Sequence, residues 1–242
     1  MKVALISDIH ANLEALKAVL KDIEIRRVDA IHCLGDIIGY GCNPRECLEL
    51  VSRHCDIILQ GNHESVMLGL LGYDHLNQLA KTSMHWTSDQ ITDQDLSLMA
   101  GYPLDARIEG AYLVHASPYQ PDQWHYILSP FEAESGLKCL PEPIGFFGHT
   151  HLPYVWSISK AGGCRSQVGH DFDPDPNNRY LVNVGSVGQP RDNDPRSCYV
   201  VYDSKEQEIR YHRVEYDIAA TQRKMTAADT DKMLIDRLVV GR

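Results

Sequence analysis

Residues 3–10, Val-Ala-Leu-Ile-Ser-Asp-Ile-His, are the part of the sequence that decides the fold. The first four residues form a short apolar run, and such runs rich in Val and Ile predict a buried β-strand. Asp8 and His10 follow the run, two residues apart. At the end of a strand this spacing lets a carboxylate and an imidazole on one face bind the same metal ion. A helix cap followed by a surface histidine is the alternative.

The same arrangement, an apolar run followed by metal-binding residue types, recurs four more times along the chain. The later clusters are Gly35-Asp36 after residues 31–34, Gly61-Asn62-His63-Glu64 after 57–59, His115 after 112–114, and Gly148-His149-Thr150-His151 after 144–147. Polar residues at the ends of buried strands meet at one edge of an open α/β sheet, where such folds place their active sites. Taken alone, Asp36 and His115 are weak signals and His149-Thr150-His151 is moderately specific, but the ordered series indicates a two-metal hydrolase.

The residue types in these clusters suit a pair of divalent cations. The carboxylate of Asp36 can bridge two ions, and the side-chain carbonyl of Asn62 is a hard oxygen ligand. His149 and His151 can each bind a different ion. This mixture of nitrogen and oxygen ligands without thiolates suits Mn, Fe, Zn, Ni or Co and does not choose among them. His63, adjacent to Asn62, points elsewhere and is a candidate general acid or base.

The sequence around these clusters predicts a largely parallel sheet at the N-terminus. A helical pattern over 13–23, with Asn12 as its N-cap, separates the first strand from a second over 30–34. A helix over 44–53 with Pro44 in its first turn then leads to a strand over 56–59. Such a β-α-β-α-β order implies parallel strands.

The rest of the chain predicts further strands and helices. Helices are expected over 77–89, 93–99 (capped by Thr92 or Asp93), 132–139 and 217–238, strands over 104–108, 111–115, 155–159, 180–184, 199–203 and 208–213, a hairpin turn at Glu109-Gly110, and an exposed loop over 162–178. The predicted fold is a mixed α/β sandwich of sheets with helices outside. It forms a single domain over 1–242, in which 64–103 is a possible helical cap over the site.

The composition predicts a globular protein of the cytoplasm. The 242 residues are 43% hydrophobic and 23% charged, which is ordinary for a globular protein. We expect no signal peptide, and no apolar run reaches the roughly 18 residues that cross a membrane. The seven cysteines form no CxxC pair, so reduced thiols are expected, with a disulfide framework as the alternative.

The formal net charge of −10 argues against broad binding of nucleic acids, because such binding depends on Lys and Arg neutralising phosphates. It does not argue against a small phosphorylated substrate, since bound cations can reverse the local field. The oligomeric state cannot be predicted from the sequence.

These clusters, in this order, resemble the calcineurin-like metallophosphoesterase superfamily, whose pattern is D-x-H, G-D, G-N-H-[ED], H and G-H-x-H. The chain is most similar to small bacterial and archaeal phosphodiesterase-like members. It shares with them Asn12, the loop 35–41 with Pro44, the sequence Val-His-Ala-Ser-Pro around His115, and Asn-Val-Gly-Ser-Val-Gly at 183–188. The resemblance implies a four-layer α/β/β/α sandwich and covers the chain to about residue 190.

The resemblance also implies roles for individual residues. One metal would be held by Asp8, His10, Asp36 and His151, and the other by Asp36, Asn62, His115 and His149. Asp36 would bridge the two ions, and a metal-bridging hydroxide would attack phosphorus in line. His63 would stabilise the transition state or protonate the leaving oxygen.

Two departures from the family are informative. Gly39 stands where Ser/Thr protein phosphatases carry the Asp that orients the catalytic histidine, and Tyr40 replaces the following Arg. A protein phosphatase of that type is therefore not expected, and what orients His63 is open. Asn12 and Arg191 are candidate substrate-binding residues, and Arg191 is favoured because guanidinium pairs bidentately with phosphate. A surface arginine beside Asp192 is the alternative.

We therefore predict a dinuclear-metal phosphoesterase that hydrolyses phosphodiester or phosphomonoester bonds of small molecules. One alternative is a non-catalytic metal-binding scaffold, but the candidate ligands and His63 are present. Another is a hydrolase of nucleotides or dinucleoside polyphosphates. Candidates for stacking on a substrate ring are Trp86, Trp124, His125 and Tyr126, which otherwise pack in the core.

Overall fold

The computed structural model describes residues 1–159 and 162–242 and contains two mixed sheets. The first has five strands, in the order β11 (Glu208–Val214), β10 (Ser197–Asp203), β1 (Lys2–Ile6), β2 (Ala30–Cys33) and β3 (Ile57–Ile58). The second has six, in the order β4 (Asp105–Ile108), β5 (Ala111–Val114), β6 (Ile144–Phe147), β9 (Asn178–Asn183), β7 (Tyr154–Ser159) and β8 (Cys164–Val168).

The predicted parallel arrangement at the N-terminus is confirmed. Strand β1 pairs in parallel with β2, which pairs in parallel with β3. Helices α1 (Leu13–Arg26) and α2 (Pro44–His54) connect them. Helix α1 begins at the predicted cap, where the side chain of Asn12 accepts a hydrogen bond from the Ala15 N–H at 3.2 Å.

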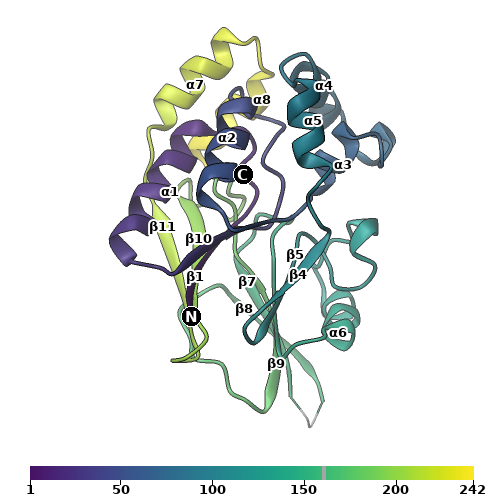
Figure 1. Ribbon diagram of the computed structural model, residues 1–242, viewed down its shortest axis with the longest axis vertical. Coiled ribbons are helices and arrows are strands. Elements are labelled where there is room, and N and C mark those ends of the chain that lie inside the picture. Colours follow the sequence, from purple (N-terminus) through teal and green to yellow (C-terminus); the bar gives the residue numbers. More distant parts are fainter. Residues whose placement is uncertain (160–161) are drawn as a thin grey trace.

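Three apolar clusters divide the molecule into four layers (Figure 1). The first packs α1 and α2 on one face of the first sheet and includes Leu16, Val19 and Tyr199. The second lies between the sheets, and the third packs helix α6 (Pro130–Cys139) on the outer face of the second sheet. The order helix, sheet, sheet, helix confirms the predicted α/β/β/α sandwich.

The helical region after β3 and the C-terminal tail are more segmented than the sequence predicts. After β3 come α3 (Asn62–Met67), η1 (Tyr73–His75), α4 (Gln78–Ser88) and α5 (Asp93–Met99), and η2 (Pro121–Gln123) follows β5. The side chain of Thr92 caps α5, as expected. The tail over 217–238 is not one helix but α7 (Ile218–Ala227), α8 (Lys232–Asp236) and η3 (Arg237–Val239). Asp229, with φ of 54°, interrupts it.

The hairpin of β4 and β5 with its turn at Glu109-Gly110 is confirmed. The prediction of a loop over 162–178 is partly wrong. Strand β8 lies in that segment and pairs with β7 at the edge of the second sheet. Its polar sequence, Cys-Arg-Ser-Gln-Val, leaves most of it exposed, so it carries no apolar signal of a buried strand. Strand β3 is shorter than predicted and covers two residues.

No helix in the described ranges combines the length and apolar character needed to cross a membrane. The seven cysteines all lie in the described ranges and are free thiols, in agreement with the prediction of reduced thiols.

Candidate metal centre

The predicted ligand residues gather where strands from both sheets end. Asp8 and His10 follow β1, and Asp36 follows β2 in the first sheet. His115 and His149 follow β5 and β6 in the second. Contacts between these loops connect the two sheets: the backbone N–H of His149 donates to Asp8 Oδ2 at 3.0 Å. The side chains are buried, which removes competing water from their charges.

The backbone at these positions is held in an uncommon conformation. Five candidate ligands have positive φ: Asp8 (53°), His10 (49°), Asp36 (53°), His149 (63°) and His151 (60°). A left-handed non-glycine residue costs on the order of 1–3 kcal/mol and persists only where its surroundings hold it. Gly148 allows the close approach, because a Cβ at this position would lie 2.3 Å from Asp8 Oδ2. Local strain of this kind concentrates at functional sites.

The first group of ligand atoms is formed by His10, His151 and Asp8. Nδ1 of His10 lies 3.2 Å from the Ile38 carbonyl, and Nδ1 of His151 lies 2.6 Å from the Gln189 carbonyl. A carbonyl only accepts, so both Nδ1 atoms carry protons and both Nε2 atoms present lone pairs. These two Nε2 atoms are 3.0 Å apart, an arrangement that a cation between them would satisfy.

The second group contains Asp36, His115 and His149. Nδ1 of His115 donates to the Leu34 carbonyl at 2.9 Å, so Nε2 is the ring nitrogen that would bind a metal. Among the described residues, Nε2 of His115, Nε2 of His149 and Oδ1 of Asn62 are buried without a hydrogen-bond partner. Unsatisfied buried polar atoms are costly, and a shared cation would satisfy these three.

Asp36 lies between the two groups. Its Oδ2 is 3.4 Å from His115 Nε2, 3.8 Å from His10 Nε2 and 3.9 Å from His63 Nε2. The other oxygen, Oδ1, accepts from the backbone N–H of His63 at 3.0 Å and fixes the carboxylate. One oxygen thus faces ligand atoms of both groups, which is the position a bridging carboxylate requires.

The electrostatics of the cluster suit metal binding. Burial opposes ionisation of Asp36, but His115, His63 and His10 together hold the pKa of the carboxyl well below its usual range. Burial, assisted by His115, lowers the pKa of His149 to about 3, and burial also lowers the pKa of His10. These rings are therefore neutral ligands at neutral pH. His115 differs: burial disfavours its charge, but the carboxylates of Asp36, Asp8 and Glu64 together raise its pKa to about 9, so a cation there would replace a proton.

Packing, rather than a carboxylate, orients His63. Its ring lies 4.8 Å from that of His10 and 4.9 Å from that of Tyr40. Gly39, with φ of 83°, makes room for it, because a Cβ there would lie 2.1 Å from His63 Nδ1. That nitrogen has no hydrogen-bond partner within the described ranges. His63 Nε2 also lies close enough to His10 and Asp36 to act as a third ligand, which is the alternative to a proton-transfer role.

Glu64 is the residue whose importance the sequence reasoning missed. Its buried carboxylate accepts four backbone hydrogen bonds of 2.8–3.3 Å, from the N–H groups of Asp36, Ile37, Ile38 and Gly61. Glu64 thereby joins the loop of Asp36 to the loop of Asn62. Burial and the charge of Asp36 raise the pKa of Glu64 to about 7, although the backbone hydrogen bonds lower it. The G-N-H-E cluster contained this residue, but a role that depends on distant backbone groups leaves no pattern in the sequence.

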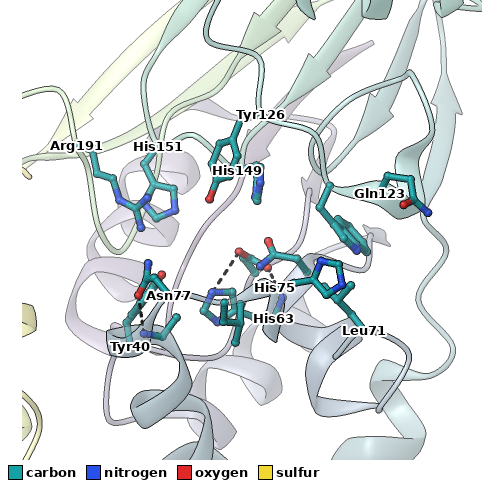
Figure 2. A pocket seen from close by; sticks show the side chains of 15 residues that line it. Tyr40, His63, Leu71, His75, Asn77, Gln123, Tyr126, His149, His151 and Arg191 are labelled. Carbon is teal, nitrogen blue, oxygen red and sulfur yellow. Dashed lines mark hydrogen bonds and ion pairs between the residues drawn. The ribbon is translucent and has the colours of Figure 1, made fainter. Parts of the chain in front are cut away.

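The cavity above the cluster has a volume of about 110 Å³. Figure 2 shows His149 and Tyr126 together at its wall, and their rings are stacked with centroids 4.1 Å apart. Trp124 also lines the cavity, whereas Trp86 and His125 do not. The helical segment 64–103 contributes five further wall residues, Leu71, His75, Leu76, Asn77 and Ala80.

The two predicted substrate-binding residues lie in different places. Arg191 lines the cavity, while its neighbour Asp192 pairs with Arg213, which argues against a simple Arg191–Asp192 surface pair. Asn12 is buried and does not line the cavity. Its side chain caps α1, donates to the Gly188 carbonyl at 2.8 Å and accepts from Thr221 Oγ1 at 3.1 Å. These bonds give Asn12 a structural role beside the site.

Comparison with known proteins agrees with this geometry. Residues 1–207 match the model of the calcineurin-like phosphoesterase superfamily domain. An uncharacterized protein from Methanocaldococcus jannaschii is 37% identical over 244 residues, covering 99% of this chain and 98% of that protein. A metallophosphoesterase from Sphaerobacter thermophilus superimposes with a TM-score of 0.87 and 38% identity, covering 100% of this chain and 99% of the other. A hypothetical protein from Pyrococcus horikoshii shares the fold, with a TM-score of 0.80 and 18% identity over 100% of this chain and 98% of the other.

Proposed function

Because the chain belongs to the calcineurin-like phosphoesterase superfamily, we propose that it is a dinuclear-metal enzyme that hydrolyses phosphodiester or phosphomonoester bonds of small molecules. The observation that carries the proposal is the position of Asp36 Oδ2 between two groups of buried histidine ring nitrogens. Asp8, His10, Asp36 and His151 would hold one ion, and Asp36, Asn62, His115 and His149 the other. Mn, Fe, Zn, Ni and Co all suit this set of ligands.

The residues around the two proposed metal sites would have different roles in the reaction. The cations would activate a water molecule and neutralise charge on the phosphoryl oxygens. His63 Nε2, at the floor of the cavity, is placed to stabilise the transition state or to give a proton to the leaving oxygen. Burial lowers the pKa of His63, and a bound phosphate would favour its charged form through opposite charge. The Arg191 guanidinium at the cavity wall is placed to pair with a phosphate oxygen.

The remaining parts of the proposal concern the surroundings of the reaction. We propose that the helical segment 64–103 acts as a cap that selects the substrate, because Leu71, His75 and Asn77 line the cavity. The substrate is a small phosphorylated molecule, and neither a membrane nor a nucleic acid is expected as a partner. Cytoplasmic localisation stays a prediction of the sequence.

Metal removal and reloading test the activity. Protein stripped by a chelator should hydrolyse neither bis-p-nitrophenyl phosphate nor p-nitrophenyl phosphate, and added Mn²⁺ should restore turnover. The restored rates also show which bond the enzyme prefers. Faster cleavage of bis-p-nitrophenyl phosphate would indicate a phosphodiesterase, and faster cleavage of p-nitrophenyl phosphate would indicate a phosphatase. Full activity in excess chelator would contradict the two-metal mechanism. A reloaded protein that binds metal but turns over neither substrate would favour the scaffold alternative.

A further inference from the structure

The ring of Tyr126 lies against a candidate metal ligand. Its ring and that of His149 stack with their centroids 4.1 Å apart and their planes inclined by 28°. The sequence suggested Tyr126 as a residue that stacks on a substrate ring, but one face of this ring is covered by His149. The hydroxyl group, at the far end of the ring, is the polar group that this arrangement presents to the cavity.

The hydroxyl of Tyr126 is a free hydrogen-bond donor. Figure 2 shows its oxygen pointing into the cavity, toward the side where His63 lies, with no hydrogen bond to the other wall residues drawn there. Burial raises the pKa of Tyr126 and Arg191 opposes this only in part, while Asp36 and Asp8 raise it further. The hydroxyl therefore keeps its proton at neutral pH and can donate it in a hydrogen bond.

The loop 116–129 holds Tyr126 between two buried anchors. Trp124 is 9% exposed, and its ring meets that of His115 edge-on with centroids 5.9 Å apart. Ile127 is buried in the apolar cluster that includes residues of α6. The backbone of Trp124 has a φ of 54°, a conformation that persists only where its surroundings hold it. These contacts restrict the side chain between them, so its hydroxyl has a defined position above the candidate ligands.

The same loop contains a second stacked pair of tyrosine and histidine, outside the cavity. The rings of Tyr119 and His125 lie with centroids 5.7 Å apart, and neither residue lines the cavity. Tyr119 is 43% exposed and Tyr126 is 48% exposed. Tyr119 therefore repeats the residue type, the stacking and the exposure of Tyr126 without the contact to a candidate metal ligand.

We propose that Tyr126 is a phosphate-binding residue, held by its stacking on His149 so that its hydroxyl donates a hydrogen bond to the phosphoryl group at the metals. The inference rests on the proposed function, because it takes the phosphoryl group to lie at the two ions. A phosphoryl oxygen carries negative charge, and a hydrogen bond to a charged acceptor is stronger than one between neutral groups. The contact is with the phosphoryl group itself, so it does not depend on the leaving group.

The test removes one oxygen atom and keeps the ring. Full-length protein carrying two Mn²⁺ ions per chain, without excess metal, is titrated calorimetrically with inorganic phosphate. Tyr126→Phe should bind phosphate roughly 10- to 100-fold more weakly than wild type, the effect of losing a hydrogen bond to a charged partner. Its metal content should be unchanged, because the ring that packs on His149 remains. Elemental analysis of the same sample measures the metal content.

Two further variants separate the hydroxyl from the ring. Tyr119→Phe removes the same atom from the same loop and should leave phosphate affinity and metal content unchanged. Tyr126→Leu removes the ring as well as the hydroxyl. It should weaken phosphate binding at least as much as Tyr126→Phe, and it should also lower the affinity for Mn²⁺, because His149 loses the ring that packs against it.

Four results would overturn the role of Tyr126. They are wild-type affinity for phosphate in Tyr126→Phe, an equal loss of affinity in Tyr119→Phe, a loss of metal from Tyr126→Phe in step with the loss of phosphate binding, and a wild-type protein that binds no phosphate. The third would mean that the hydroxyl acts through the metal ligand. Failure of the proposed function is distinguishable, since it would appear as wild-type protein that binds phosphate at its metals but cleaves no phosphate ester.

Discussion

Replacing His63 with alanine should reduce turnover by roughly 10²–10⁴ while the protein keeps its full metal content, because positioned proton transfer contributes on that scale. His63 lines the cavity beside Asp36, and within the described residues its side chain makes no hydrogen bond that holds a predicted ligand in place. Steady-state kinetics of the Mn²⁺-loaded variant, together with elemental analysis of the same sample, measure both quantities.

His54→Ala is the matched control for this variant, because His54 is exposed at the end of α2 and does not line the cavity. It should change neither turnover nor metal content. A fall in metal content of His63→Ala in parallel with its activity would mean that His63 is a ligand with His10 and Asp36, and the assigned role would be wrong.

Replacing Asp36 with asparagine should have the larger effect on the metals. Asparagine keeps the oxygen that accepts from the His63 N–H but loses the charged oxygen that faces His115 and His10. Without a bridging carboxylate the two sites no longer share a ligand, and we expect fewer than two ions per chain. Turnover should fall roughly 10³-fold or more, since metal-ion stabilisation supplies several kcal/mol of the barrier reduction.

The control for this variant is Asp89→Asn, at an exposed position after α4. It makes the same change of charge and should leave the metal content and turnover at wild-type levels. Two bound ions in Asp36→Asn with unchanged turnover would contradict the bridging role. Thermal unfolding of both variants checks that the comparison is made on folded protein.

That the candidate metal ligands lie together could be predicted from the sequence, because their signal is local. Asp8, His10, Asp36 and His149 each follow an apolar run, and the parallel strands place the ends of those runs together. The hairpin of β4 and β5 and the start of α1 carry equally local signals. Strand β8 does not, because an exposed polar edge strand lacks an apolar pattern.

Other features depend on groups that only the fold brings together. Glu64 acts on the backbone of residues 36–38, and Arg237 meets Arg191 through the side chain of Gln189. The orientation of His63 depends on the absence of a side chain at Gly39. None of these relations follows from spacing along the chain, so sequence patterns could group the candidate ligands but could not identify the residues that position them.

The most direct test of the central claim is anomalous diffraction from a crystal of the Mn²⁺-loaded protein. We expect two anomalous peaks on either side of Asp36 Oδ2, one next to His10 and His151 and the other next to His115 and His149. A single peak, or two peaks that do not share Asp36, would contradict a two-metal centre bridged by this carboxylate.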